Sequence, residues 1–218
     1  MKQKTIVVFD FDKTISCKDT YLPFLWLAIK QAPRRILPAI KLPFAVFLYY
    51  AGVIDNSKLK CIFLQTILGK ASKEHVHTIT KQFIKQLFNG GLFEEAIKTI
   101  EHHKSLRHRL VLASASFDFY IRPIAEQLGF DDCVCTHAAW SESGVLLGTI
   151  DGENCYGKAK LQSLTELIDT RNEFYIVCYS DHYSDFPILQ WADKAYIVNP
   201  SNSLLKKIKN TKIEKLKW

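Results

Sequence analysis

The sequence lacks the cysteine spacings that are typical of zinc-binding and thiol-redox modules. It has six cysteines, but no two of them form a CxxC pair, and no group of cysteines and histidines has zinc-finger spacing. Several of the cysteines lie in apolar runs, which favours buried free thiols in a reducing compartment over disulfides. The beginning of the chain also lacks a secretory-signal pattern, because its apolar run is short and leads directly into Asp10 and Asp12. We therefore expect a cytoplasmic protein.

Internal repeats and low-complexity segments are also absent from the sequence. Its 218 residues suffice for one large domain or for one domain with an inserted module. The hydrophobic content of 48% and the charged content of 23% are those of a folded globular protein.

The formal net charge of +7 is concentrated toward the end of the chain. Against the single Glu214, residues 201–218 contain Lys206, Lys207, Lys209, Lys212, Lys215 and Lys217. Aromatic residues are not interleaved with these lysines, as a platform for nucleic acid would require. We expect a solvated lysine-rich tail or helix face and no nucleic-acid partner, with attraction to an anionic membrane surface as the alternative.

The stretch from Thr5 to Thr14, TIVVFDFDKT, combines an apolar run with two acidic residues. Its first five residues are short, β-branched and free of turn residues, which predicts a buried strand. Asp10 and Asp12 then follow at the carboxyl end of that strand. Burying carboxylates is costly unless they are paired or bind a metal, and ligands of open α/β sheets bind beyond this end of the strands. The stretch therefore predicts a metal or phosphate site.

Residues 16–90 predict an all-helical module that contains no strand. Its most unusual part is residues 36–54, ILPAIKLPFAVFLYYAGVI, which are long and apolar enough to be considered as a membrane helix. Three residues argue against a helix that crosses the whole membrane. Lys41 places a charge inside this run, and Pro38 and Pro43 interrupt helical hydrogen bonding. We expect a buried helical hairpin, and the alternative is a segment lying on a membrane surface beside Arg34 and Arg35.

After this module the pattern changes to strands that alternate with helices. This alternation predicts a parallel sheet with helices on both of its faces. The expected strands are 109–113, 133–139, 174–179 and 195–198, and the expected helices between them are 119–128, 158–168 and 185–191. The predicted fold is therefore a Rossmann-like α/β core, formed by residues 1–15 and 91–218, with an all-helical cap of residues 16–90 inserted after the first strand.

Polar residues follow two more of the predicted strands. Ser114 ends the second strand, and Asp181 with Asp185 lies where a later strand passes into a helix. Between them, Asn154 to Lys160 reads NCYGKAK, with two lysines at a helix start. Carboxylates that gather at one point repel unless they share a cation, and hard oxygen ligands favour Mg²⁺. A lysine and a serine hydroxyl suit phosphate charge, so the set indicates phosphoryl transfer.

At these positions the sequence resembles the haloacid dehalogenase superfamily of phosphohydrolases. DFDKT matches the DxDxT first motif, Ser114 the second, a lysine at 158 or 160 the third, and the Asp181/Asp185 pair the fourth. The motifs occur in the family's order, and the match covers essentially the whole chain. A helical insert directly after the first motif resembles the phosphoserine-phosphatase-like subfamily IB, whose cap lies there.

The resemblance implies a role for each matched residue. Asp10 would attack phosphorus and form an aspartyl phosphate, and Asp12 would act as general acid and then general base. Asp181 would bind Mg²⁺ with Asp10 and with the backbone carbonyl of Asp12, and Asp185 would support the metal or its waters. Ser114 would hydrogen-bond the phosphoryl oxygens.

Two further positions stay open at this stage. Phosphoserine phosphatases suggest Lys158 as the phosphate-binding lysine, whereas an Asn-Cys-x-Gly-x-x-Lys pattern in the same subfamily selects Lys160, which we favour. Asp19 falls where phosphoserine phosphatases carry a cap glutamate that contacts the substrate amine. It either contacts substrate or caps the helix that begins near Thr20.

The resemblance leaves the substrate less certain than the reaction. The expected substrate is a small phosphorylated metabolite similar to phosphoserine. The fourth motif reads YSDHYSD in place of a Gly-Asp-Gly form, and the only cap arginines are Arg34 and Arg35. These departures and the apolar insert resemble a bacterial branch that includes a phosphatidylglycerophosphate phosphatase. The alternative is therefore a lipid phosphatase, peripheral on the inner face of the membrane. A phosphotransferase or a non-catalytic module on the same fold are the remaining alternatives.

Overall fold

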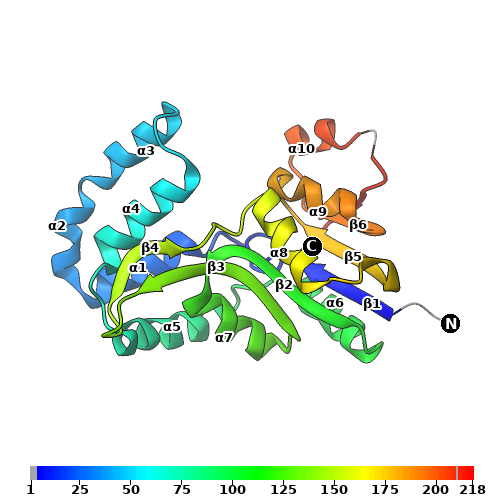
Figure 1. The fold of residues 1–218 in the computed structure, drawn as a ribbon, viewed down its shortest axis with the longest axis horizontal. Coiled ribbons are helices and arrows are strands. Elements are labelled where there is room, and N and C mark those ends of the chain that lie inside the picture. The colour runs from blue at the N-terminus through cyan, green and yellow to red at the C-terminus, as the bar shows by residue number, and fades with distance from the viewer. Residues whose placement is uncertain (1–3, 210) are drawn as a thin grey trace.

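The computed structural model describes residues 4–209 and 211–218, in which a seven-stranded sheet with the order β4-β3-β2-β1-β5-β6-β7 forms the centre of the molecule (Figure 1). All neighbouring strands are parallel except the antiparallel pair β3–β4. The strands are β1 (Lys4–Phe9), β2 (Arg109–Phe117), β3 (Asp132–Trp140), β4 (Leu146–Asp151), β5 (Phe174–Ser180), β6 (Lys194–Val198) and β7 (Glu214–Leu216). The Rossmann-like α/β core that the sequence predicts is confirmed.

Strand β1 is apolar from Ile6 to Phe9 because this part is central and both of its faces are covered. It pairs with β2 on one side and with β5 on the other. Val7 and Phe9 join the hydrophobic cluster on one face of the sheet, and Ile6 and Val8 join the cluster on the opposite face. Side chains of any strand point alternately to the two faces of its sheet, and here both faces are covered by a hydrophobic layer.

Helices cover both faces of the core sheet (Figure 1). They are α6 (Glu94–Ser105), α7 (Asp118–Leu128), α8 (Lys158–Leu167), α9 (Phe186–Trp191) and α10 (Asn202–Lys207). Apolar residues of α6 and α7 belong to the cluster that contains Phe9, whereas those of α8, α9 and α10 belong to the cluster that contains Val8. Helix α7 ends at Gly129, whose φ of 73° is the left-handed conformation that favours glycine at this position.

Between β1 and α6 the described chain is helical. This part comprises α1 (Tyr21–Gln31), a 3-10 turn (Pro33–Arg35), α2 (Ile36–Ala39), α3 (Leu42–Tyr50), α4 (Asn56–Leu68) and α5 (Lys73–Phe88). The connections into and out of these helices lie side by side, because Ser16 pairs with Leu92 and the Cys17 N–H donates to the Gly91 carbonyl at 2.9 Å. This pairing supports our proposal that residues 16–90 form a cap on a core of residues 1–15 and 91–218.

The cap helices share a hydrophobic core with the sheet domain. Phe24 of α1 stacks on Tyr120 of α7, with ring centroids 4.8 Å apart, and contacts Phe83 of α5 edge to face. The extended β3–β4 hairpin also reaches the cap, where the Leu146 N–H donates to the Ala71 carbonyl at 2.9 Å. Apolar and backbone contacts therefore both fix the cap to the core.

The structure differs from the sequence expectations in three places. The buried hairpin expected for residues 36–54 is wrong: α2 has no buried residue, and α3 buries only Leu42 and Ala45. The lysine-rich end is not merely a solvated tail or helix face, because β7 pairs with β6 as the edge of the sheet. Strand β2 continues beyond Ala113 to Phe117, which places Ser114 inside the strand.

Other sequence expectations agree with the structure. All six cysteines are free thiols, and three of them are buried. In residues 4–209 and 211–218, no helix combines the length and the apolar character that a membrane crossing requires.

Candidate active site

Three adjacent central strands bring the motif residues together. Asp10 directly follows β1, Asp181 directly follows β5, and Ser114 lies near the end of β2, which pairs with β1. The carboxyl ends of parallel strands meet at one edge of the sheet, so residues distant in sequence converge there. The fully buried Thr14 completes this group, because its hydroxyl lies 3.2 Å from Asp10 Oδ2 and 3.4 Å from Asp181 Oδ1.

Lys160 forms the centre of a buried ionic cluster at this edge. Its Nζ donates to Asp10 Oδ1 at 2.8 Å and to Asp185 Oδ2 at 2.9 Å. Asp185 Oδ2 also accepts a hydrogen bond of 2.8 Å from the Ser180 hydroxyl. Lys158, in contrast, is exposed at the first position of α8. Of the two candidate lysines, the structure places only Lys160 beside Asp10.

The turn before α8 aims Lys160 into the cluster. Gly157 precedes the helix with φ 60° and ψ −120°, a backbone conformation that residues with a Cβ rarely adopt. A residue one position further along a helix is rotated by about 100°, so Lys158 and Lys160 project from different sides of α8. The glycine turn therefore decides which of the two lysines faces the sheet.

Burial and charge act against each other in this cluster. Burial raises the pKa of Asp10 well above its usual range; Lys160 opposes this, while the charges of Asp185 and Asp181 add to it. Burial by itself would lower the pKa of Lys160, but the charges of Asp10 and Asp185 raise it well above the ordinary lysine value. Lys160 therefore stays charged, and it is the cation that stabilises the Asp10 carboxylate.

The Asp12 side chain turns away from this cluster toward the cap. Its Oδ1 accepts from the Thr20 N–H at 2.7 Å and from the Thr20 hydroxyl at 2.5 Å, and its Oδ2 accepts from the Ser116 hydroxyl at 2.8 Å. Burial is the main cause that raises the pKa of Asp12, and the charge of Asp19 adds to it. Asp10 and Asp12 thus occupy different environments although they are two residues apart.

Asp19 and Ser114 take positions at the border of the site. The Asp19 side chain is exposed, and its Oδ1 accepts a 3.1 Å hydrogen bond from the Tyr21 N–H at the start of α1. Ser114 is fully buried, and its hydroxyl oxygen accepts a 3.0 Å hydrogen bond from the Ser116 N–H. The capping alternative for Asp19 is therefore present in the structure, and Ser114 is held by the end of its own strand.

Sequence reasoning missed two of the groups that hold Asp12 in place. Ser116 is not among the site residues that the sequence predicts, and Thr20 enters that prediction only as the start of a helix. The Ser-Ala-Ser spacing could have indicated Ser116, because residues two apart on a strand share one face. No comparable signal marks Thr20, whose contact with Asp12 depends on how the chain enters the cap.

Lys60 of α4 is a third residue that the sequence reasoning missed. Its buried ammonium donates to the Ala115 carbonyl, to Asn154 Oδ1 at 3.0 Å and to the Thr136 hydroxyl at 3.3 Å. Burial lowers the pKa of Lys60 to about 8, and the charge of Asp12 opposes this shift. Its position one helical turn before the buried Leu64 could have indicated that it faces inward.

Two buried polar atoms of the described residues lack a hydrogen bond of good geometry, and both border the site: the Tyr120 hydroxyl, which lies near Thr20 and Ser116, and Asp185 Oδ1. Burial raises the pKa of Tyr120 well above its usual value, and the negative charge of Asp12 raises it further, which places this phenol near Asp12. Buried polar atoms without partners are uncommon in native proteins. Their position here is consistent with groups that complete their contacts when ligands bind.

The donor set fits a Mg²⁺ ion. Asp10, Asp181 and Asp185 supply only hard oxygen ligands, and Lys160 balances one of their three charges. Asp185 Oδ1 keeps an unused buried lone pair. Within the described chain, no three or more His, Cys, Asp or Glu side chains gather closely enough to enclose a metal. Mg²⁺ does not need such a cage, since one or two carboxylates with water and substrate oxygens suffice.

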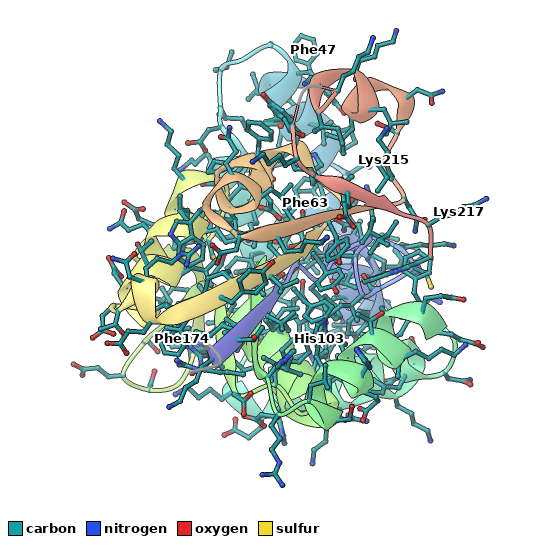
Figure 2. All side chains as sticks on the ribbon, turned by 90° about the vertical axis from the view of Figure 1, so that its right-hand side faces the viewer. Phe47, Phe63, His103, Phe174, Lys215 and Lys217 are labelled. Carbon is teal, nitrogen blue, oxygen red and sulfur yellow. The ribbon has the colours of Figure 1, made fainter. Side chains whose placement is uncertain are left out.

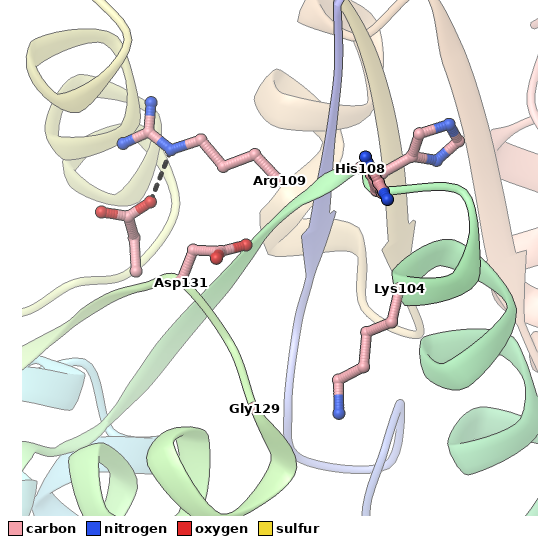
Figure 3. A pocket seen from close by; sticks show the side chains of 7 residues that line it. Lys104, His108, Arg109, Gly129 and Asp131 are labelled. Atoms are coloured by element: carbon pink, nitrogen blue, oxygen red, sulfur yellow. Dashed lines mark hydrogen bonds and ion pairs between the residues drawn. The ribbon is translucent and has the colours of Figure 1, made fainter.

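A different hollow lies at the amino-terminal ends of the parallel strands, where β2 begins (Figure 3). Several of its charged groups have partners: Arg109 Nε donates to Asp132 Oδ2 at 2.6 Å, and Lys104 pairs with Glu101 at 2.9 Å. The motif residues lie at the carboxyl ends of the strands, so this hollow is separate from the candidate active site.

Comparison with known proteins identifies the family of the chain. Residues 7–190 match the family described as haloacid dehalogenase-like hydrolase. Protein CicA of Caulobacter vibrioides is 29% identical over 87% of this chain and 83% of its own length. A probable phosphatase of Mycobacterium tuberculosis is 28% identical over 94% of this chain and 72% of its own length.

Solved structures show the same fold. A Bordetella pertussis protein of unknown function covers 99% of both chains with a TM-score of 0.87 and 19% identity. A substrate-bound phosphoserine phosphatase has a TM-score of 0.67 and 19% identity, and the match covers 99% of this chain and 94% of that one. With a family match that spans most of the sequence, this chain belongs to the haloacid dehalogenase-like hydrolases.

Proposed function

We propose that this protein is a Mg²⁺-dependent phosphatase that hydrolyses a phosphomonoester through an aspartyl phosphate on Asp10. The observation that carries the proposal is the contrast between the two aspartates after β1. Asp10 accepts from the Lys160 ammonium at 2.8 Å, which opposes the rise in pKa that burial causes, whereas Asp12 accepts only from uncharged donors. Carboxylates in such different environments suit different roles in one reaction.

In the first step, Asp10 attacks phosphorus while Asp12 donates a proton to the leaving oxygen. The raised pKa of Asp12 favours retention of that proton. Lys160 and Ser114 are positioned at the same edge of the sheet to stabilise the negative charge of the phosphoryl oxygens. Asp10, Asp181 and the backbone carbonyl of Asp12 would hold Mg²⁺, with support from Asp185, and the ion would supply further charge neutralisation.

In the second step, Asp12 acts as a base. Having lost its proton to the leaving group, it accepts one from a water molecule that attacks the aspartyl phosphate. Thr20 and Ser116 keep the carboxylate in place through both steps, because each donates to it in the structure. The cycle ends with inorganic phosphate and a protonated Asp12.

The substrate that we propose is a small phosphorylated metabolite. The likeness of the fold to phosphoserine phosphatases supports this choice over a lipid substrate. This chain differs from phosphoserine phosphatases as a class in two respects. Its fourth motif has no Gly-Asp-Gly form, and its cap helices α4 and α5 contain no arginine. We therefore propose a substrate of similar size and place Asp19 at the entrance of the cap as a candidate contact.

The reaction is tested with a generic aryl phosphate, with and without Mg²⁺. We expect Mg²⁺-dependent phosphate release that EDTA removes, and a loss of at least about 10³-fold in turnover for Asp10→Asn. Asp169→Asn, an exposed aspartate at the end of α8, is the matched control and should keep wild-type turnover. Phosphate release that persists in Asp10→Asn would contradict the assigned nucleophile.

A second measurement tests the covalent step. Acid quenching during turnover of a ³²P-labelled substrate should leave protein-bound label that hydroxylamine removes, as expected for an acyl phosphate. Asp10→Asn should carry no such label. A wild-type enzyme that turns over without any labelled protein would favour direct attack by water and would contradict the intermediate. A screen of phosphorylated amino acids, sugars, nucleotides and lipid head groups then identifies the leaving group.

A further inference from the structure

The outer side of the cap exposes a dense group of large hydrophobic side chains. We define the apolar face by its members: Ile36, Leu37, Ile40, Phe44, Phe47, Tyr50 and Val53, which are 54% to 82% exposed. In the part of the chain that the structure describes, 14 large hydrophobic residues are exposed, and these seven occur within residues 36–53. Exposed apolar side chains are common singly, but such a concentration marks an interaction surface.

The sequence of α2 and α3 cannot bury this face within the monomer. Both helices are apolar on nearly all sides, yet α2 packs beside α4 without burying a residue, and α3 buries only Leu42 and Ala45. Phe44 and Phe47 instead lie against each other, with ring centroids 6.4 Å apart, and both remain 64% exposed. Figure 2 shows Phe47 at the tip of the cap, away from the sheet.

Basic side chains outnumber acidic ones in and beside the segment that carries the apolar face, where the exposed Asp19 and Asp55 stand just outside its two ends. Residues 20–54 contain four basic residues and no aspartate or glutamate. Lys30, Arg34 and Lys41 are all exposed. A two-fold contact with a second copy would bring these cations toward one another, which is unfavourable. A partner that is apolar and anionic matches the face in both respects.

We propose that the apolar face docks the enzyme on an anionic lipid bilayer. Helices α2 and α3 would lie in the plane of the interface, with their aromatic and aliphatic side chains among the acyl chains and the cations among the head groups. This arrangement agrees with the helix lengths, since none of the described helices could cross a bilayer. The inference concerns location and is independent of the proposed reaction.

A second cationic element lies toward the same side. In Figures 1 and 2, α3 and α10 both extend to the upper side of the molecule. Helix α10 carries the exposed Lys206 and Lys207. Lys207 Nζ lies 4.3 Å from the ring centroid of Tyr183, two residues after Asp181. Docking through α3 would therefore bring the lysines of α10, beside the candidate active site, toward the lipid head groups.

Vesicle sedimentation tests the proposal with the purified full chain. We expect binding to phosphatidylglycerol/phosphatidylcholine vesicles, at least about tenfold weaker binding to pure phosphatidylcholine, and weakening at high salt. Replacing Phe44, Phe47 and Tyr50 together by serine should reduce binding by about tenfold or more. The matched control replaces three exposed residues of the α/β domain outside the cap, Leu106, Leu147 and Tyr175, by serine and should bind like the wild type.

Three further readouts make the outcome decisive. Turnover of a soluble aryl phosphate without vesicles and the thermal unfolding curve should be unchanged in the Phe44/Phe47/Tyr50 variant, which separates loss of docking from loss of folding. Failure of the wild type to bind anionic vesicles would overturn the proposal. So would equal loss of binding in the control variant. A wild-type dimer that the cap substitutions dissociate, without vesicle binding, would assign the face to self-association instead.

Discussion

The carboxyl edge of the sheet and the apolar face of the cap depart from the usual distribution of residues in opposite ways. At the sheet edge, Asp10, Asp185 and Lys160 are charged groups that the fold buries. On the cap, Phe47 and its neighbours are apolar groups that the fold leaves in water. Burying the charged groups costs free energy because they lose their hydration. Exposing the apolar side chains forgoes the free energy that their burial would contribute. The comparison supports our two proposals, in which each region contacts a ligand outside the monomer.

The two regions also differ in how they are held. The charged edge is fixed by direct hydrogen bonds, so a change in one group affects its partners at once. The apolar face makes few contacts with the rest of the chain, so its residues should be replaceable without effect on the fold. The following predictions test this difference, from the largest expected effect to the smallest.

Replacing Lys160 by methionine should have the largest effect of these changes. It leaves Asp10 and Asp185 buried without their cation, and we expect turnover to fall by about 10²- to 10³-fold. Lys158→Met removes an exposed lysine two positions earlier and should keep turnover within about twofold of wild type. The measurement is turnover of an aryl phosphate, with circular dichroism to confirm folding. A greater loss in Lys158→Met would contradict the assignment of Lys160.

His103 shows what burial does to a group without an opposite charge. Its Nε2 lies 3.0 Å from the Tyr179 hydroxyl, and burial lowers its pKa from 6.5 to about 4. The folded state therefore resists protonation, whereas the unfolded chain accepts the proton. The contribution of neutral His103 to the free energy of unfolding should be fully present above about pH 6.5. It should be lost as the pH drops toward 4, by about 3 kcal/mol at most.

Denaturant unfolding between pH 4 and pH 8 measures this loss. His103→Gln should flatten the pH dependence below pH 6.5, because glutamine does not titrate there. His77→Gln, at an exposed position of α5, should retain the wild-type slope. An unchanged slope in His103→Gln would show that other groups carry the acid sensitivity.

Lys60→Met should produce an intermediate effect at the contact between cap and core. The loss of its ammonium leaves the Ala115 carbonyl and Asn154 with one donor fewer, next to the strand end that holds Ser114 and Ser116. We expect turnover to fall by about tenfold, which is the size of one lost charge-assisted hydrogen bond. Lys60→Arg should restore part of the activity, and Lys58→Met, at an exposed position of the same helix, should have no effect. Equal turnover in Lys60→Met and wild type would remove Lys60 from the site.

The smallest effect is expected on the apolar face. Phe47→Ser should change the free energy of unfolding by no more than about 0.5 kcal/mol, because the side chain is already 64% exposed. Phe83→Ser, in the buried part of the same cap, should destabilise by about 3 kcal/mol or more. Denaturant titration of both variants gives the comparison. A large destabilisation by Phe47→Ser would mean that the monomer covers this face in solution.

Much of the fold and the convergence of the motif residues could be predicted from the sequence. The apolar run before Asp10 is recognisable because a central strand is covered on both faces and has no polar alternation. The DFDKT motif, Ser114 and the Asp181/Asp185 pair each stand at or near a strand end. Parallel strands bring such ends together whatever the details of packing, so their convergence also follows from the pattern.

Other features could not be predicted because they depend on how separate elements pack. The apolar content of residues 36–54 suggested burial, but burial requires a surface that covers the side chains, and α2 packs beside α4 without burying a residue. The contacts of Asp12 with Thr20 and Ser116 join a cap entrance to the end of β2 across about 100 residues of chain. Such contacts between distant segments cannot be predicted from the local sequence.

The sequence by itself determined the strand-end carboxylates, the order of the motifs and the helical nature of the insert, because these follow from local composition and from the periodicity of side chains. The sequence pattern favoured Lys160 over Lys158, and the tertiary structure decided that Lys160 faces Asp10. Only the tertiary structure decided that Lys60 links cap to core and that the apolar face is exposed. The physical reason is that these outcomes depend on helix rotation and on the surfaces of neighbouring elements, which spacing along the chain does not specify.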